Sequence, residues 1–405
     1  MFDVEAIRSQ FPALSLEVNG HPLTYLDNGA SAQKPQRVID RISKAYSFEY
    51  ANVHRGLHHL SNVATENFEQ ARKKVQTFIG AEKEEEIIFT KSATEAFNLV
   101  AHSLIAPEIQ PGDEIIISLM EHHSNIVPWH YLKERYGAVI RWIPVLDDGT
   151  LDMLAFENLL NEKTKLVAVT HMSNVLGTIN PINEICEKAH SVGAYVVVDG
   201  AQAAVHEKID MTWQECDFYV MTGHKLYGPS GIGVLYGRHD ILSQMRPFLG
   251  GGEMIKSVTT EHIEYADLPH RFEAGTPPIV QAIALGEALD FLTEIDMGAI
   301  KIHEKELLNY ANSQMAALDK VRIIGNCPSK GSIITFSVKD IHAHDISAIL
   351  DKYGVAVRAG THCAEPLLTH FGETSTCRAS MGMYNTKEDI DRFIEALSKA
   401  IQFFS

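Results

Sequence analysis

Cysteines are few in this sequence and long apolar runs are absent. The five cysteines of the 405-residue chain stand far apart: Cys186, Cys216, Cys327, Cys363 and Cys377. An odd, scattered set does not form a disulfide framework, and free thiols are typical of a reducing compartment. Runs such as Tyr195–Val198 are strand-sized, and the first 20 residues contain no apolar signal region. We therefore expect a cytoplasmic protein without a membrane partner.

Basic residues are also scarce relative to acidic ones. The chain has 35 Lys and Arg against 52 Asp and Glu, which gives a formal net charge of -17. A nucleic-acid partner is not expected, because the phosphate backbone favours Lys and Arg; the acidity has an ordinary explanation in solubility. Repeats and Pro-, Gly- or Ser-rich linkers are missing too. A hydrophobic content of 45% nevertheless allows a large core, and the length suits two or three domains.

The middle of the chain alternates short apolar runs with helical patterns. The runs at 86–90, 114–118, 165–170, 194–199 and 217–221 are predicted to be buried strands, with helices at 94–104 and 181–192 between some of them. Such alternation predicts an α/β fold with a mostly parallel sheet flanked by helices. Parallel sheets bind ligands at the carboxyl ends of their strands. The loops that follow these five runs should therefore carry the chemistry.

The pattern changes near residue 277. Helical stretches at 279–294 and 298–318 precede short strands at 321–324 and 332–338, and helices near 345–352 and 387–403 follow. We expect three parts: an N-terminal arm (1–20) that packs on the small domain, a large domain (21–276) that contains the predicted parallel sheet, and a small α+β domain (277–405).

A lysine follows one of the predicted strands. Lys225 lies in the run Thr222–Pro229 (TGHKLYGP), directly after the strand at 217–221. A lysine in a partly desolvated cleft has a lowered pKa and forms Schiff bases with carbonyl groups. The alternative is a surface lysine in a turn, and this run alone does not decide between the two.

The preceding predicted strand ends in an acid. Asp199 closes the run VVVD, and Gln202 follows three positions later. Pyridoxal phosphate, which binds lysine as a Schiff base, needs a carboxylate beside its ring nitrogen to keep that nitrogen protonated and the ring electron-accepting. Asp199 fits this need, and Gln202 is a candidate partner for the phenolic oxygen. Taken alone, Asp199 serves equally well as a helix N-cap.

A phosphate site is predicted where Ser92-Ala93-Thr94-Glu95 follows the strand at 86–90 and opens a helix. Helix N-termini bind anions because their N–H groups and dipole point at the ligand. Thr94 is the candidate ligand, joined by Thr222 and His224 from the lysine run. An ordinary N-cap is the alternative for this segment.

Two further loops carry candidates. His122, in the run EHHSN after the strand at 114–118, offers a flat imidazole that can stack on a pyridine ring and move protons near neutral pH. Asn174, after the strand at 165–170, is a candidate contact for the ring oxygen, or else a turn residue. The pair His122-His123 predicts no metal, because no third ligand stands at a zinc-like spacing.

In this order, and over essentially the whole chain, these motifs resemble the class-V aminotransferase family of fold-type I pyridoxal-phosphate enzymes. Four further runs resemble the group II, or SufS-type, cysteine desulfurases of that family: Leu26–Ser31 (LDNGAS), Asn52–Gly56 (NVHRG), Arg271–Pro277 (RFEAGTP) and Arg358–Pro366 (RAGTHCAEP). Each run is short, so the specificity of the resemblance comes from finding all of them in order. Ala93 and Gly29 depart from it, since relatives often carry Thr and Ala there.

The resemblance implies a role for each matched residue near the cofactor. Lys225 holds pyridoxal phosphate and moves protons, Asp199 pairs with the ring nitrogen, and His122 stacks on the ring. Gln202 and Asn174 contact the oxygen side of the ring. The residues implied to hold the phosphate are Thr94, Thr222, His224 and, across the interface of a homodimer with shared sites, Thr276.

The resemblance also implies the handling of the substrate, L-cysteine. Arg378 grips its carboxylate, a bidentate task suited to guanidinium, and the other residues expected at the substrate are Arg358, Asn28 and His54. Cys363 takes the sulfur as a persulfide and L-alanine leaves. A nucleophilic thiol must be accessible and deprotonated, and positive charge from Arg358, Arg378 and His362 is expected to favour this.

The cysteine run from Arg358 to Pro366 is short. Group I desulfurases carry their cysteine on a longer, mobile loop that delivers sulfur directly. A short loop keeps the persulfide near the pocket, so the resemblance implies a SufE- or SufU-type acceptor protein that collects the sulfur for iron–sulfur cluster assembly.

Three alternatives stay open. A selenocysteine lyase shares the scaffold and can dispense with Cys363. Another β-lyase or a class-V aminotransferase would release pyruvate or transfer the amino group to a keto acid. A non-catalytic sulfur carrier or scaffold, finally, would leave Lys225, Asp199 and Arg378 without a purpose as a set.

Overall fold

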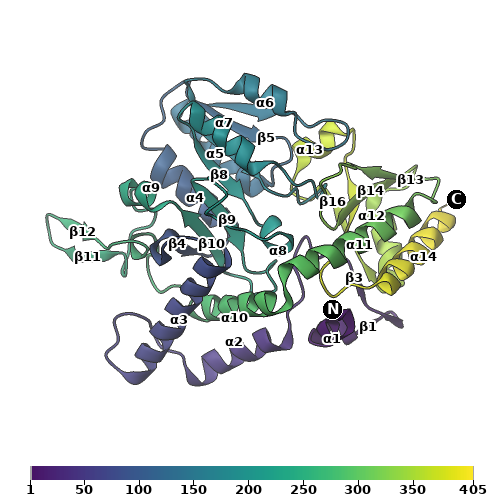
Figure 1. Cartoon of the computed structure of the whole chain (residues 1–405), viewed down its shortest axis with the longest axis horizontal. Helices are drawn as coiled ribbons and strands as arrows, with labels where there is room; N and C mark the ends of the chain where they lie inside the picture. The colour runs from purple at the N-terminus through teal and green to yellow at the C-terminus, as the bar shows by residue number, and fades with distance from the viewer. Residues whose placement is uncertain (1, 405) are drawn as a thin grey trace.

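The computed structural model describes residues 2–404, which form a larger body around a seven-stranded sheet and a smaller body beside it (Figure 1). The strands of the large sheet lie in the order β4 (Ile87–Thr90), β10 (Gly233–Gly237), β9 (Phe218–Thr222), β8 (Tyr195–Asp199), β7 (Thr164–Thr170), β5 (Glu114–Ser118) and β6 (Val139–Ile143). Within the described residues, β10 is the one strand of this sheet that runs against its neighbours. The predicted mostly parallel α/β sheet is confirmed.

Helices cover both faces of the large sheet. On one face, Phe97 of α4 (Ala93–Val100) and Trp129 of α5 (Val127–Tyr136) pack with strand residues such as Val197. On the other face the apolar side chains come from α3 (His59–Phe78), α7 (Ile182–Ser191) and α10 (Ile279–Ile295). Strands whose side chains are buried on both faces have continuous apolar sequences, and this is why the five runs were recognisable.

Two strands of this sheet were not predicted. β6 lies at the sheet edge, where Arg141 interrupts the apolar run VIRWI and four of its five residues are at least partly exposed. β10 begins and ends with glycine, which is typical of loops. The glycine has a packing reason: a Cβ on Gly233 would lie 2.4 Å from the backbone of Ser92. β10 therefore lets the loop after β4 approach closely.

The smaller body is an antiparallel sheet covered by helices. Its strands lie in the order β13 (Val321–Ile324), β14 (Ile333–Val338), β17 (Thr376–Ser380) and β16 (Arg358–Gly360). The helices whose side chains share its apolar core are α11 (Met297–Met315), α12 (Ala343–Lys352) and α14 (Lys387–Phe403). α13 (Glu365–His370) begins at the last two residues of the cysteine run. The predicted α+β character is thus present after α10.

The N-terminal segment contacts this smaller body. Arg8, at the end of α1 (Val4–Arg8), forms an ion pair with the buried Asp389 at 2.9 Å. β3 (Thr24–Tyr25) pairs in parallel with β15 (Val355–Ala356). The domain limits at residues 20 and 277 stay predictions, and α10 itself packs on α3 and on α2 (Gln36–Phe48) of the larger body.

The remaining elements are short, and they are β1 (Glu17–Val18), β2 (His21–Pro22), α6 (Met153–Leu159), α8 (Ala203–His206), α9 (His239–Gln244), β11 (Ile255–Val258) and β12 (Ile263–Tyr265). The β11–β12 hairpin projects from the larger body (Figure 1). Across residues 2–404, every helix is too short or too polar to span a lipid bilayer.

Candidate active site

A cavity of about 360 Å³ lies where the carboxyl ends of the parallel strands meet the smaller body. Its lining brings together eleven of the fourteen residues predicted to bind cofactor or substrate: Thr94, His122, Asn174, Asp199, Gln202, Thr222, His224, Lys225, Arg358, Cys363 and Arg378. They come from the ends of β8 and β9, from the segments that follow β4, β5, β7, β8 and β9, including the first turn of α4, and from β16, β17 and the turn after β16. A shared cavity is what the strand-end argument predicted for these loops.

Lys225 lies three residues beyond β9, half-buried, with its amine enclosed by the cavity. Burial lowers the pKa of this amine to about 8, although the nearby Asp199 carboxylate acts in the opposite direction. A near-neutral pKa leaves a useful fraction of the amine unprotonated at physiological pH. Lys225 is therefore a competent nucleophile and proton carrier.

Asp199 is the last residue of β8 and is buried. Burial raises the pKa of its carboxyl group, while Lys225 and the Ala201 N–H, which donates to Oδ1 at 2.9 Å, oppose the rise. Among the described residues, no side chain donates a hydrogen bond to Asp199. Its second oxygen is free to pair with a protonated ring nitrogen, as pyridoxal phosphate requires.

The two amide side chains of the cavity are partly engaged. Gln202 Nε2 donates to the Gly29 carbonyl at 2.7 Å, and Asn174 Nδ2 donates to the His362 carbonyl at 2.8 Å. Through its side chain Asn174 therefore links the segment after β7 to the cysteine run, and its own carbonyl accepts a hydrogen bond from Arg378 of β17. Each amide keeps an oxygen and one N–H for a ligand.

The predicted phosphate site has a helix N-terminus and free hydroxyls. Ser92 caps α4 by accepting from the Glu95 N–H at 3.2 Å, while Thr94 is exposed in the first turn. In residues 2–404, the hydroxyls of Thr94 and Thr222 form no side-chain hydrogen bond. Burial lowers the pKa of the adjacent His224 to about 4, so this imidazole meets an anion as a neutral hydrogen-bond donor.

His122 is held in one orientation. Its Nδ1 accepts from the Ser124 N–H at 3.1 Å and lies 2.8 Å from the Ser124 hydroxyl. Burial, followed by the positive charge of Lys225, lowers the pKa of His122 to about 3. The ring is neutral, with its remaining proton on Nε2, and a neutral flat ring suits stacking.

Cys363 is the one exposed cysteine among the described residues. Gly360, His362 and Cys363 all have positive φ (134°, 53° and 55°), which folds the run into a tight turn. The Cys363 carbonyl accepts from the His123 N–H at 2.8 Å. By contrast, burial raises the pKa of Cys186 and Cys377 to about 12. The exposed thiol is therefore the reactive candidate.

The expectation that His362 supplies positive charge is wrong. Its side chain is buried against Thr376, and burial lowers its pKa to about 3. The positive charge beside Cys363 comes from Arg378 and Arg358 alone of the three predicted sources. Burial lowers the pKa of Arg378 to about 10, which still leaves it a cation at neutral pH.

Asp27 is a site residue that the sequence argument missed. Its carboxylate pairs with Arg378 at 3.4 Å and with Arg358 at 3.2 Å. Arg378 Nη1 donates to the Asn174 carbonyl, but its buried Nε has no partner among residues 2–404. Asp27 orients both guanidinium groups; its place in the quoted run LDNGAS was the available signal.

Glu121 was missed as well. Fully buried beside the cavity, it accepts from the Thr170 N–H at 2.9 Å and from Asn125 Nδ2 at 2.6 Å, and it contacts Ser118. Burial raises its pKa to about 8. Glu121 joins the ends of β5 and β7 and fixes the start of the His122 loop.

Three predicted residues lie outside the cavity lining. Asn28 is buried behind the wall, where Nδ2 donates to the Ser380 carbonyl at 2.8 Å. His54 lies in a separate cluster with Glu69, and Thr276 is exposed on a loop. Gly29, in contrast, lines the cavity and packs tightly: a Cβ there would lie 3.3 Å from the Arg378 guanidinium.

The chain matches the model of the aminotransferase class-V family over residues 24–393. A cysteine desulfurase of Dickeya dadantii is 49% identical, covering 98% of this chain and 97% of its own. A probable cysteine desulfurase of Halobacterium salinarum is 46% identical, covering 100% and 98%. These two relatives, which match this chain over nearly their whole length, are thus a cysteine desulfurase and a probable cysteine desulfurase.

Solved structures give the same result. The cysteine desulfurase CsdA from Escherichia coli is 37% identical with a TM-score of 0.93, covering 100% of this chain and 99% of its own. The cysteine desulfurase from Thermococcus onnurineus has the same identity and TM-score, with 98% of both chains covered. A C-DES mutant with glycine linked to its PLP cofactor shares the fold at 23% identity and a TM-score of 0.83.

Fold, cavity and comparisons together define a fold-type I pyridoxal-phosphate enzyme. Within that class the chain belongs to the class-V aminotransferase family, and its place there is among the cysteine desulfurases.

Proposed function

We propose that this enzyme removes the sulfur of L-cysteine, releases L-alanine, and collects the sulfur as a persulfide on Cys363. One observation carries the proposal: an exposed thiol shares a cavity with the enclosed amine of Lys225 and the buried cation Arg378. A thiol, a nucleophilic amine and a carboxylate-binding cation are what this reaction requires of the protein.

The residues of the cavity fit pyridoxal phosphate. Asp199 would hold the ring nitrogen, His122 the ring face, and the α4 N-terminus with Thr222 the phosphate. The bound cofactor supplies an electron sink for the carbon that carries the substrate amino group. Gly233 supports this fit, because the close approach of β10 shapes the loop in which a phosphate would lie.

The remaining chemistry belongs to this chain. Arg378 binds the substrate carboxylate through guanidinium atoms that Asp27 and the Asn174 carbonyl hold in place. The amine of Lys225 takes the proton from the α-carbon and returns it. The Cys363 thiolate attacks the substrate sulfur, so that an S–S bond forms while the C–S bond breaks. The β-carbon keeps the bonding electron pair and takes a proton, which gives alanine.

A protein acceptor is proposed for the next step. Hydrogen bonds from His123 and Asn174 hold the carbonyls of Cys363 and His362, so the cysteine run is tied to the large body at two points. A sulfur held this way has to be collected at the pocket. We propose a SufE- or SufU-type acceptor, with the sulfur passing to iron–sulfur cluster assembly.

A homodimer is proposed from the exposed apolar side chains of two segments. Leu57, before α3, is fully exposed, and Val258, Ile263 and Tyr265 of the β11–β12 hairpin are 43–60% exposed. Apolar side chains gathered on projecting segments favour a protein–protein contact. Thr276, exposed on its loop, would then lie on a shared interface.

The described cysteines are all free, which supports a cytoplasmic location.

Alanine formation from L-cysteine in the presence of a thiol tests the function. The parent enzyme should form alanine and carry one extra sulfur on Cys363 by mass spectrometry. Lys225→Ala should lose roughly 10²–10⁴-fold in rate, the range for removal of a general base. Cys327→Ala, which removes a buried thiol outside the cavity, is the control.

Cys363→Ala separates this proposal from its nearest alternative. The variant should lose turnover of cysteine and keep turnover of selenocysteine, because selenium leaves without a thiol attack. Retention of alanine formation from cysteine would show that Cys363 is not the sulfur acceptor.

A further inference from the structure

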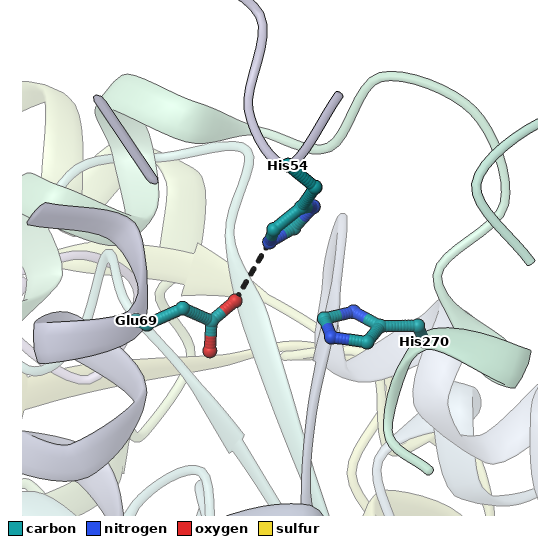
Figure 2. A group of neighbouring side chains, drawn as sticks. All are labelled: His54, Glu69 and His270. Carbon is teal, nitrogen blue, oxygen red and sulfur yellow. Dashed lines mark hydrogen bonds and ion pairs between the residues drawn. The ribbon is translucent and has the colours of Figure 1, made fainter. Parts of the chain in front are cut away.

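Three side chains from distant parts of the chain meet outside the active-site cavity (Figure 2). His54 lies in the loop before α3, Glu69 lies on α3, and His270 opens the short helix η5 (His270–Phe272). One ligand atom of each lies within 4.8 Å of the others. His54 Nε2 and Glu69 Oε1 are 2.9 Å apart, and the two imidazole rings meet edge to face with centroids 4.7 Å apart.

We propose that His54, Glu69 and His270 bind a first-row divalent transition cation of the Zn²⁺ type. Two imidazoles and one carboxylate are a donor set that such cations use, with a further position left for water. A cation about 2 Å from each donor requires donor atoms within roughly 4 Å of one another. The observed spread of up to 4.8 Å exceeds this limit by about 1 Å, so the donors would have to draw together by that amount to bind a cation.

Carboxylates stand behind both imidazole rings. Glu253 Oε2 lies 3.8 Å from Nδ1 of His54, and Glu273 Oε2 lies 3.9 Å from Nδ1 of His270. Metal-bound histidines commonly have a carboxylate on the side of the second ring nitrogen, where it favours a proton on that nitrogen. A proton on Nδ1 of both rings would leave Nε2 for the cation, which would take the place of the present contact between His54 Nε2 and Glu69 Oε1.

The local charge also favours a cation. Three carboxylates (Glu69, Glu253 and Glu273) face two guanidinium groups, and these are Arg72, paired with Glu69 and Glu273, and Arg55, paired with Glu253. Arg72 Nε binds Oε2 of Glu69 at 2.7 Å, and its Nη2 is more distant from Oε1, at 3.3 Å. Oε1 is therefore the oxygen presented to the imidazoles.

The site would join three segments of the larger body. His54 has a left-handed backbone (φ 68°), and its N–H donates to Thr65 Oγ1 of α3 at 2.8 Å. Such a conformation is uncommon for a residue other than glycine and is found where surrounding contacts hold it. A cation would add a bond from this loop to α3 and to η5.

Zinc titration of the chelator-treated, cofactor-loaded enzyme tests the proposal. Calorimetry should find one more Zn²⁺ equivalent in the parent than in His270→Gln, and Glu69→Gln should lose the same equivalent. Cys363 is present in all of these chains, so zinc bound by its thiol cancels in the comparison. His262→Gln, an exposed histidine of the β11–β12 turn, should bind like the parent. Equal zinc stoichiometry in the parent and His270→Gln would overturn the proposal.

Two measurements guard against a variant that simply misfolds. Circular dichroism and cofactor absorbance of each variant should match the parent.

Glu253→Gln, which leaves the three donors in place, should weaken zinc binding roughly 10–100-fold, as loss of an outer carboxylate does. Zinc-soaked crystals of the parent should show anomalous scattering among the three donors. Scattering only elsewhere, or none, would show that the cluster is a hydrogen-bonded network and not a metal site.

Discussion

Burial sets the charge of most titratable side chains in the cavity. It lowers the pKa of Lys225 to about 8 while it keeps His122 and His362 neutral, with pKa values of about 3. The cations left near the reactive thiol are therefore guanidinium groups, whose pKa is high enough to survive desolvation. This explains why a sequence that is rich in histidine at this place still depends on arginine for positive charge.

Arg378→Lys should raise KM for L-cysteine about 10–100-fold, because an ammonium cannot form the two parallel bonds of a guanidinium and Arg378 is fully enclosed. kcat should fall less. Steady-state kinetics of alanine formation measure both. Arg322→Lys, at an exposed arginine of β13 outside the cavity lining, is the control. An equal rise in KM for both variants would contradict the assignment of Arg378.

Glu121 should make stability depend on pH. Its pKa of about 8 in the folded chain exceeds the ordinary value of 4.5 because of burial. Between these values the folded state keeps a proton that the unfolded state has released, so this group's contribution to the free energy of unfolding falls as pH rises. Glu121→Gln removes that titration, and the variant should gain stability relative to the parent between pH 4.5 and 8.

Urea unfolding at several pH values measures the effect of Glu121→Gln. The exposed Glu66→Gln should show a difference from the parent that does not change over the same pH range. A constant difference for Glu121→Gln would mean that the Glu121 carboxyl titrates normally in the folded protein.

At the scale of elements, the central strands with continuously apolar sequences were easier to predict than the edge strand β6 and the glycine-bounded strand β10. The predicted strand at 194–199 appears as β8 (Tyr195–Asp199), and the predicted strand at 217–221 as β9 (Phe218–Thr222). Both are central and buried on two faces, so their sequences are continuously apolar. β6 and β10 were missed because edge position and close glycine packing remove that signal.

The N-terminal arm offers a test of how one element is attached. Arg8→Ala should cost about 2 kcal/mol in the free energy of unfolding, because Arg8 bonds the buried Asp389 at 2.9 Å and the Tyr384 carbonyl at 3.0 Å. Hydrogen exchange of α1 should accelerate while that of the large sheet stays unchanged. Arg322→Ala, which removes an ion-paired arginine of the smaller body whose own side chain is 59% exposed, is the control. Unchanged exchange in α1 would mean that other contacts hold the arm.

At the scale of the whole molecule, the proposed homodimer predicts a mass of twice 45.0 kDa, about 90 kDa, by light scattering. Val258→Asp should shift the enzyme toward monomer, because a carboxylate in an apolar interface stays desolvated and unpaired. Leu154→Asp on α6 is the matched control, with a side chain 70% exposed against 60% for Val258. A parent enzyme that is monomeric would remove the basis for a role of Thr276 at a shared site.

The sequence by itself determined the α/β class, the loops that carry chemistry and most of the cavity residues. These follow from local patterns: apolar periodicity marks the strands, and Lys225 and Asp199 stand directly at strand ends, where a parallel sheet gathers its loops. The motif order then identified the family, because several short runs in one order are far more specific than any one of them.

Only the tertiary structure decided which charges survive and which distant residues meet. Asp27 is shared by two arginines more than 300 positions away, and His54, Glu69 and His270 come from three separate segments. Neither contact has a local signature, because both depend on how complete elements pack. Burial acts in the same way: the neutrality of His362 comes from the side chains and backbone around it in space, which no short run of sequence specifies.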